Sequence, residues 1–384
     1  MPSFGRVLFL GIGGGNDIFS CTLAASSLYA DGWRWKKCAF AGVLSPFHYH
    51  TVKPTGIGGL FLTQPSSERH LLRRQGARAI RFVDSAVSAF VASGKPFDCT
   101  GVYGISLMDG SMGVAWTLKQ LVPRLFDYVV LVDVGGDCFY RGPQDTHVLS
   151  PFFDATVLRG FIDARVRGVL FEAGPGTDGE LEPEALASVL QSVQATSNPL
   201  RESMIDQLDA WYRQWVEPVR PGRTVSMTIS AFRSPEHMLT VRYRARAHLG
   251  ATRRYAYFDQ RIDTELCRSY YVVDPSRISN PLAIESRSPI DWFIKTQLQG
   301  QHVNNETNLE YWARGNQIVH LLTPSPLLDA NDRRDLIAQG IDELAAGVCD
   351  EAWLLPGDQG LVGEFVNHHV AWEETETAFI LRRC

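Results

Sequence analysis

The stretch Val7-Leu-Phe-Leu-Gly-Ile-Gly-Gly-Gly-Asn-Asp17 decides the expected fold. A short apolar run passes directly into a glycine-rich loop, and residues 18–29 then have helical character. A continuous apolar run is typical of a strand that is buried on both faces. A strand followed by a glycine loop and a helix is the first half of a βαβ unit, so the stretch predicts an α/β protein with a parallel sheet.

The same order of strand, loop and helix recurs along the first half of the chain. Strands alternating with helices imply right-handed crossovers and a Rossmann-like, mostly parallel sheet. Such sheets bind ligands outside the carboxyl ends of their strands, so we expect the site at that edge. The further strands are expected at 39–43, 79–83, 102–105, 128–132 and 169–171, with a helix at 112–121.

The second half of the chain has a different pattern. A boundary near residue 225 follows the sequence Pro218-Val-Arg-Pro-Gly222. We expect a Rossmann-like domain at 1–225, which carries the glycine-rich loops, and a mixed α+β region at 226–384, which covers the site. The expected strands are 226–232, 239–245, 254–258, 270–273, 318–322, 353–355 and 378–381, with helices at 290–299 and 331–346.

Composition excludes several classes of partner. The 384 residues carry a net charge of −5, which gives no electrostatic case for nucleic acid or an anionic membrane surface. No apolar run approaches the roughly 18 residues of a membrane helix. Seven scattered cysteines without a Cys-x-x-Cys pair indicate reduced thiols. We expect a cytoplasmic protein that acts on a small-molecule substrate. The sequence does not decide whether the protein is a monomer or a homo-oligomer.

The first loop offers an anion site at a helix N-terminus. Gly13, Gly14 and Gly15 let the backbone approach a ligand closely. A dinucleotide fingerprint requires a glycine at position 16, where this chain has Asn16. It also requires an acid after the second strand, where this chain has none, so no dinucleotide is expected. The Gly-x-Gly-x-Gly spacing suits S-adenosylmethionine, but the acid expected after the second strand is missing for this ligand too. A Walker A loop is excluded because no Lys-Ser/Thr follows the glycines. The remaining interpretation is a catalytic loop with Asn16 and Asp17 aimed at substrate or metal; the alternative is a tight turn that Asp17 caps.

A second loop, after the fifth expected strand, is acidic. Asp133 and Asp137 flank the turn Gly135-Gly136. Carboxylates at this spacing suit Mg²⁺ or Mn²⁺, or they divide into acid and base roles. The alternative is a turn in which Asp137 satisfies local backbone N–H groups.

Two more strand ends carry polar groups. The loop Gly174-Pro-Gly-Thr-Asp-Gly-Glu180 contributes Gly176, Asp178 and Glu180, or it is a surface turn followed by a helix cap. Ser106 ends the fourth expected strand. We expect Gly13, Asp17, Ser106, Asp133, Asp137 and Gly176 to line one cleft.

These motifs together resemble one family. Gly13-Gly-Gly-Asn-Asp17, Val132-Asp-Val-Gly-Gly-Asp137, Ser150-Pro-Phe-Phe-Asp154 and Gly174-Pro-Gly-Thr-Asp-Gly-Glu-Leu181 are similar to the proteins of domain of unknown function 1152, over roughly residues 5–320. In that family the first loop often reads Gly-Gly-Gly-Asp. The resemblance implies a Rossmann-like domain and a shared site built from these loops, and it brings no reaction with it.

We expect a metabolic enzyme, a metal-assisted hydrolase or lyase acting on a phosphorylated or nucleoside-like metabolite. In this hypothesis the glycines of the first loop bind the anion. Asp17, Asp133 and Asp137 hold Mg²⁺ or Mn²⁺, or act as acid and base together with Glu180.

Arg242 and Arg244 would reach the ligand from the second half, because arginine suits bidentate recognition of phosphate. Two other classes stay open: an enzyme that uses NAD or S-adenosylmethionine, and a non-catalytic ligand-binding protein. Gly-x-Ser-x-Gly and His-Glu-x-x-His are both missing from the sequence, so a serine hydrolase and a zinc protease have no support.

Overall fold

The structure is a computed structural model of the chain. It describes residues 2–13, 17–44, 52–63, 83–94, 96–107, 110–142, 144–145, 148, 151–217, 223–246, 255–281, 311–314, 317–322, 338, 341, 344–345, 351–354, 370–374 and 379–383.

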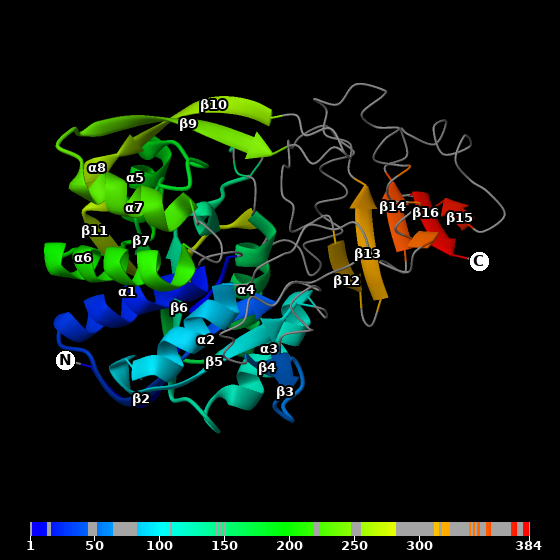
Figure 1. The fold of residues 1–384 in the computed structure, drawn as a ribbon, viewed down its shortest axis with the longest axis horizontal. Coiled ribbons are helices and arrows are strands. Elements are labelled where there is room, and N and C mark those ends of the chain that lie inside the picture. Colours follow the sequence, from blue (N-terminus) through cyan, green and yellow to red (C-terminus); the bar gives the residue numbers. More distant parts are fainter. Residues whose placement is uncertain are drawn as a thin grey trace.

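A nine-stranded sheet in the order β3-β4-β5-β2-β1-β6-β7-β11-β8 forms the centre of the protein (Figure 1). Neighbours from β5 to β7 are parallel. In chain order these strands run 3-2-1-4-5, which is the doubly wound Rossmann arrangement with its switch point between β1 and β6. The strands are β1 (Ser3–Gly11), β2 (Arg34–Leu44), β3 (Val52–Pro54), β4 (Leu60–Thr63), β5 (Cys99–Ser106), β6 (Tyr128–Val134), β7 (Gly168–Ala173), β8 (Thr196–Pro199) and β11 (Ser269–Val273).

The outer strands of this sheet are antiparallel. β4 pairs with β5 and with β3 on one side, and β11 pairs with β7 and with β8 on the other. The α/β fold with a mostly parallel sheet is therefore confirmed. The division at residue 225 stays a prediction, while β11, which follows that residue, is a strand of the large sheet.

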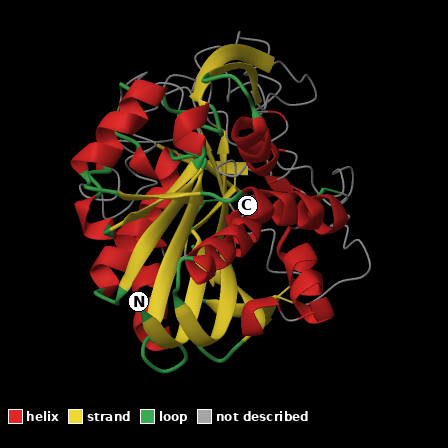
Figure 2. Ribbon diagram, turned by 90° about the vertical axis from the view of Figure 1, so that its left-hand side faces the viewer, coloured by secondary structure: helices red, strands yellow, loops and turns green. Residues whose placement is uncertain are grey.

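Helices cover both faces of the sheet (Figure 2). Alternate residues of β1 point to opposite faces, because side chains alternate along a strand. Val7 and Phe9 pack with α1, α2, α6 and α7, whereas Leu8 and Leu10 pack with α3, α4 and α5. The helices are α1 (Asp17–Ala30), α2 (Val83–Gly94), α3 (Gly110–Leu121), α4 (Pro151–Ala164), α5 (Pro183–Ser192), α6 (Glu202–Trp211) and α7 (Arg223–Arg233).

One expected strand is a helix. Residues 226–232 lie within α7, so the β prediction for this segment was wrong. Val225 and Ile229 are buried four residues apart, which is the spacing of one helix face. The hydroxyl of Thr228 donates to the carbonyl of Thr224 (2.9 Å), which is the local bond that threonine makes in a helix. Packing against the sheet outweighs the β preference of Thr and Ile here.

The third expected strand, 79–83, also differs. Val83 begins α2, so the predicted strand end and Asp84 lie in a helix, and 79–82 fall outside the described residues. The expected helix at 290–299 lies outside them as well. Of the expected helix at 331–346, the structure describes 338, 341 and 344–345, which are helical.

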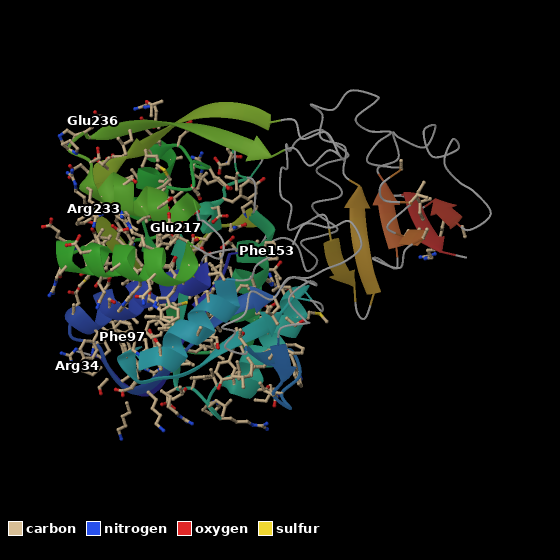
Figure 3. The ribbon with its side chains drawn as sticks, viewed as in Figure 1. Arg34, Phe97, Phe153, Glu217, Arg233 and Glu236 are labelled. Carbon is tan, nitrogen blue, oxygen red and sulfur yellow. The ribbon has the colours of Figure 1, made fainter. Side chains whose placement is uncertain are left out.

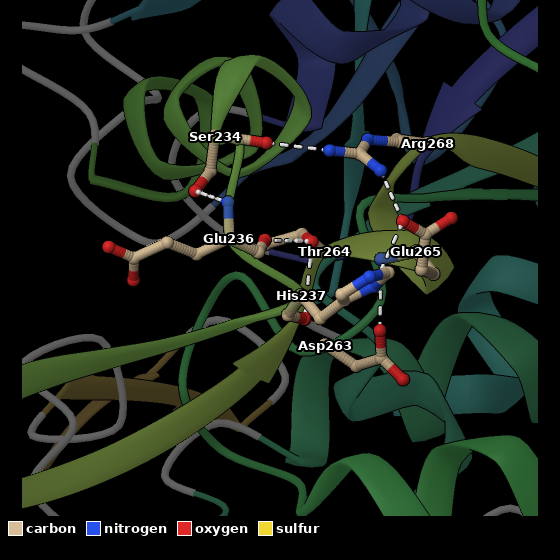
Figure 4. A network of polar contacts seen from close by, with 7 residues as sticks. All are labelled: Ser234, Glu236, His237, Asp263, Thr264, Glu265 and Arg268. Carbon is tan, nitrogen blue, oxygen red and sulfur yellow. Dashed lines mark hydrogen bonds and ion pairs between the residues drawn. The ribbon is translucent and has the colours of Figure 1, made fainter.

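A hairpin of β9 (Met238–Arg246) and β10 (Tyr255–Asp263) follows α7. Figure 4 shows the polar contacts at its base, which join α7 to α8 (Thr264–Cys267). The backbone N–H of Thr264 donates to the carbonyl of His237 (3.0 Å). The guanidinium of Arg268 donates to the carbonyl of Ser234 (2.6 Å) and pairs with Glu265. Both ends of the hairpin are thereby tied to the helices beside the sheet.

A second, five-stranded sheet lies in the C-terminal part, as the expected mixed α+β region requires (Figure 1). None of the helices that the structure describes is long and apolar enough to cross a membrane. The strands are β12 (Tyr311–Arg314), β13 (Gln317–Leu322), β14 (Glu351–Leu354), β15 (Val370–Glu374) and β16 (Phe379–Arg383), in the order β12-β13-β14-β16-β15.

Candidate functional site

The loops after β1 and β6 meet at the switch point of the sheet. Ile12 extends β1, and its N–H donates to the carbonyl of Val132 in β6 (3.0 Å). In Figure 3, Phe153 marks the beginning of α4 near this carboxyl edge, whereas Arg34 and Phe97 mark the amino ends of β2 and β5 at the opposite edge. The expected edge of the sheet is therefore the edge at which the acidic loops gather.

Asp17 begins α1 and closes the first loop. The N–H of Gly13 donates to Oδ2 of Asp17 (2.8 Å). A Cβ on Gly13 would collide with that carboxylate and would lie 3.2 Å from Oδ1 of Asp154 in α4. Glycine is thus required at position 13 because two carboxylates occupy the space beside it.

Asp133 and Glu172 lie side by side on neighbouring strands. The register of β6 and β7 pairs the two residues directly, and both side chains are completely buried. They share a face with Leu131 and Leu170, which pack on the α4 and α5 side. Oδ1 of Asp133 and Oε1 of Glu172 have no hydrogen-bond partner among the described residues. Buried oxygens in that state lack compensation for their lost hydration.

The loop after β7 folds against the loop after β6. The N–H of Gly176 donates to the carbonyl of Gly135 (2.5 Å), and Gly135 has a left-handed φ of 127°. A Cβ at Gly135 would lie 2.6 Å from Oδ2 of Asp178. The N–H of Glu180 donates to Oδ1 of Asp178 (2.9 Å). Both acids are buried, so this loop turns inward rather than into solvent.

Acidic side chains from these loops and from α4 form one cluster. Within the described part of the chain, three sets of potential metal ligands have their ligand atoms within 4.8 Å of one another. Asp133 belongs to two of the sets. They are Asp17, Asp133 and Asp154; Asp133, Cys138 and Glu172; and Asp137, Asp178 and Glu180.

The cluster favours the neutral form of its acids. Burial, followed by the charge of Asp133, raises the pKa of Asp17 well above its usual value. Burial and then the charge of Asp154 do the same to the pKa of Asp137. Burial and then Asp133, by charge and by a hydrogen bond, raise the pKa of Glu172. Adjacent buried carboxyl groups of this kind cannot all remain charged without a compensating proton or cation.

The structure brings together most of the predicted site residues. Ser106 ends β5, which β2 separates from β1. Gly14, Gly15 and Asn16 lie outside the described residues. Arg242 and Arg244 lie in β9 opposite Asp259 and Tyr257, and their side chains are not among those described. The residues brought together are Gly13, Asp17, Asp133, Gly135, Gly136, Asp137, Gly176, Asp178 and Glu180.

Reasoning from sequence missed three members of the cluster: Asp154, Cys138 and Glu172. Glu172 had a usable signal. Leu170-Phe-Glu-Ala-Gly174 repeats the pattern of Leu131-Val-Asp-Val-Gly135, with an acid near the end of an apolar strand and a glycine after it. Asp154 ends the motif Ser150-Pro-Phe-Phe-Asp154, which carried part of the family resemblance, but it was assigned no role because an acidic residue in the first turn of a helix is also an ordinary helix stabiliser.

The arrangement has the parts of a metal-binding or proton-transfer site. Carboxylate oxygens are the ligands that Mg²⁺ and Mn²⁺ take, and Asp137 is the partly exposed acid of its set. Acids whose pKa values are raised by burial and by neighbouring charges are candidates for general acid or base.

Fold and site together define a doubly wound α/β protein with a buried acidic cluster at its switch point. The chain belongs to the family described as "protein of unknown function (DUF1152)", which matches residues 8–263. The matched segment contains every residue of the three ligand sets. No curated protein and no solved structure matches the chain.

Proposed function

We propose that the protein is an enzyme that uses a divalent cation, Mg²⁺ or Mn²⁺, to hydrolyse or eliminate a group from a small phosphorylated or nucleoside-like metabolite. The observation that carries the proposal is the cluster itself. Carboxyl groups from the loops after β1, β6 and β7 and from α4 form three sets, and within each set the ligand atoms lie within 4.8 Å of one another. A cation at their centre removes the repulsion that otherwise forces protons onto them.

The set Asp17, Asp133 and Asp154 suits the cation best. Its members are oxygen ligands alone, and two of them, Asp17 and Asp154, lie beside Gly13 in the loop before α1. This set replaces the predicted set, because Asp137 groups with Asp178 and Glu180 instead of with Asp17. A phosphate at the N-terminus of α1 would meet both the helix dipole and the cation. A cation there supplies Lewis-acid polarisation of a phosphoryl or carbonyl oxygen.

Asp137 is proposed as the acid and base. It is the partly exposed member of its set, and its pKa is raised by burial and by four neighbouring carboxyl groups. A raised pKa keeps a proton available close to neutral pH, which general acid catalysis requires. Asp178 and Glu180 lie within ligand distance of it, and their charges contribute to its raised pKa.

The test combines a substrate screen with one isosteric variant. The full chain, freed of metal by a chelator, is incubated with phosphorylated metabolites with and without Mg²⁺ or Mn²⁺, and product release is measured. Turnover should require the cation, and Asp137→Asn should lower kcat by about a hundredfold or more. Asp206→Asn, in an exposed pair with Arg233, is the matched control and should retain full activity. Full activity of Asp137→Asn, or turnover that is indifferent to chelation, would contradict the proposal.

A nucleotide cofactor is the second candidate, because the glycine loop lies at the switch point of a Rossmann-type sheet. Against it, Asn16 stands at the third fingerprint position and β2 ends at Leu44 without an acid. Thermal melting of the full chain with NAD or S-adenosylmethionine separates the two. A saturable rise in Tm with either cofactor would favour this candidate over the cation-dependent one.

A further inference from the structure

A second ligand set lies in the interior, on the β7 side of Asp133. Asp133, Cys138 and Glu172 each have no exposed surface, and their ligand atoms lie within 4.8 Å of one another. Sequence reasoning and the family match assign no role to Cys138 or Glu172. This set, called the inner set below, differs from the other two in having a sulfur ligand. It shares Asp133 with the set of Asp17, Asp133 and Asp154, which is called the outer set.

The inner set contains oxygens that lack a partner. Oδ1 of Asp133 and Oε1 of Glu172 are buried and accept no hydrogen bond from the described residues. No ion pair joins either carboxyl group to a basic side chain in the described part of the chain. Buried polar atoms are satisfied in nearly all native structures, so two facing carboxyl groups on adjacent strands need either a proton shared in the hydrogen bond between them or a cation in its place.

The position of Cys138 is held from two sides. Its N–H donates to Oδ2 of Asp133 (3.4 Å), and its carbonyl accepts from Nδ2 of the buried Asn280 (3.0 Å). Its Sγ lies 4.0 Å from Oε2 of Glu172. The thiol therefore faces the two carboxyl groups without any rearrangement of the backbone.

We propose that Asp133, Cys138 and Glu172 bind a second divalent cation of thiophilic character, with Zn²⁺ as the best match. A thiolate with two carboxylates suits Zn²⁺ and disfavours Mg²⁺, which takes oxygen ligands. Binding of the cation would release the thiol proton and any carboxyl proton that the set holds. Asp133 would then be a ligand shared by this cation and the one proposed at Asp17, Asp133 and Asp154, as in two-metal hydrolytic sites. The bridge rests on the proposed function, whereas the inner site stands without it.

Cobalt(II) is the probe, because it substitutes for Zn²⁺ and gives a near-ultraviolet charge-transfer band only with a thiolate ligand. Metal-free full chain is titrated with Co²⁺, and the band should appear, saturate and be displaced by Zn²⁺. Cys138→Ser should abolish the band. Cys38→Ser is the matched control and should keep the band. Cys38 is equally buried, but it lies at the start of the buried part of β2, where its thiol donates to the carbonyl of Phe97.

Two results would overturn the inner site. One is a band that survives in Cys138→Ser. The other is a band lost in Cys38→Ser, which would place the thiolate at Cys38 and its strand neighbour Cys99. Glu172→Gln keeps the thiol and provides a second test if Cys138→Ser does not fold, as judged by circular dichroism. Its Co²⁺ affinity should fall about tenfold or more, and unchanged affinity would refute the assignment.

The same titration separates this inference from the proposed function. Asp17→Asn removes a ligand of the outer cation alone, so it should abolish turnover and retain the cobalt band. A band without turnover of any phosphorylated metabolite would refute the proposed function and leave the inner site intact. Cation-dependent turnover without a band would refute the inner site and leave the proposed function intact.

Discussion

Asp133→Asn is the substitution that shows whether the acidic cluster is compensated by a bound cation or by protons on its carboxyl groups. Asparagine has nearly the same volume as aspartate, and its amide oxygen can still accept from the N–H of Cys138. The variant removes one charge from a side chain with no exposed surface, next to Glu172. Because like charges in this cluster repel, the metal-free variant should be at least as stable as the metal-free wild type.

The cation-bound forms should differ strongly. A cation at a concentration of 100 Kd stabilises the folded protein by about 2.7 kcal/mol. With roughly 2–4 °C of Tm per kcal/mol for a domain of this size class, wild type should gain roughly 5–10 °C. Asp133 belongs to both the outer and the inner ligand sets, so Asp133→Asn should lose nearly the whole gain.

Thermal melting of metal-free protein, with and without Mg²⁺, Mn²⁺ or Zn²⁺, measures both effects. Asp206→Asn, on the surface of α6, is the control and should keep the full shift. The reasoning is refuted if Asp133→Asn keeps the wild-type shift. It is equally refuted if the metal-free variant loses several kcal/mol, because the carboxylate would then have a cationic partner within the protein.

Three further results are expected. The raised pKa values of Asp17, Asp137 and Glu172 mean that the folded protein binds more protons than the unfolded chain above the ordinary carboxyl pKa. Metal-free stability should therefore fall as the pH rises above about 5, and a cation should flatten the fall; a Tm that rises with pH above that value contradicts the cluster. Gly135→Ala places a Cβ at a φ of 127° against Asp178 and should cost about 1–3 kcal/mol in urea unfolding, whereas Gly94→Ala, whose Cβ meets nothing within 4 Å, should be neutral or stabilising. Thr228→Val breaks the buried hydroxyl contact with Thr177 (2.8 Å) and should cost about 1–3 kcal/mol by the same measurement; no loss would mean that Thr177 finds another partner.

The two acidic loops could be found from sequence because local pattern specifies them. An apolar strand that ends in glycine and aspartate predicts both the turn and its place at the carboxyl edge of the sheet. Asp17, Asp133 and Asp137 were named on that basis, and the structure brings them into one cluster. Segment 226–232 shows the limit of such reasoning, since its Thr and Ile residues favour a strand while the four-residue spacing of Val225 and Ile229 is that of a helix face, and packing against the sheet selects the helix.

By itself, the sequence determined the class of fold, the edge of the sheet at which the candidate site lies and the acidic character of that candidate site. Only the tertiary structure decided which acids act together. The register of β6 against β7 pairs Asp133 with Glu172, and the packing of α4 brings Asp154 to Asp17. These are contacts between segments far apart in the chain, so no local pattern encodes them. Their grouping depends on strand order and helix packing, which arise from burial of the whole core.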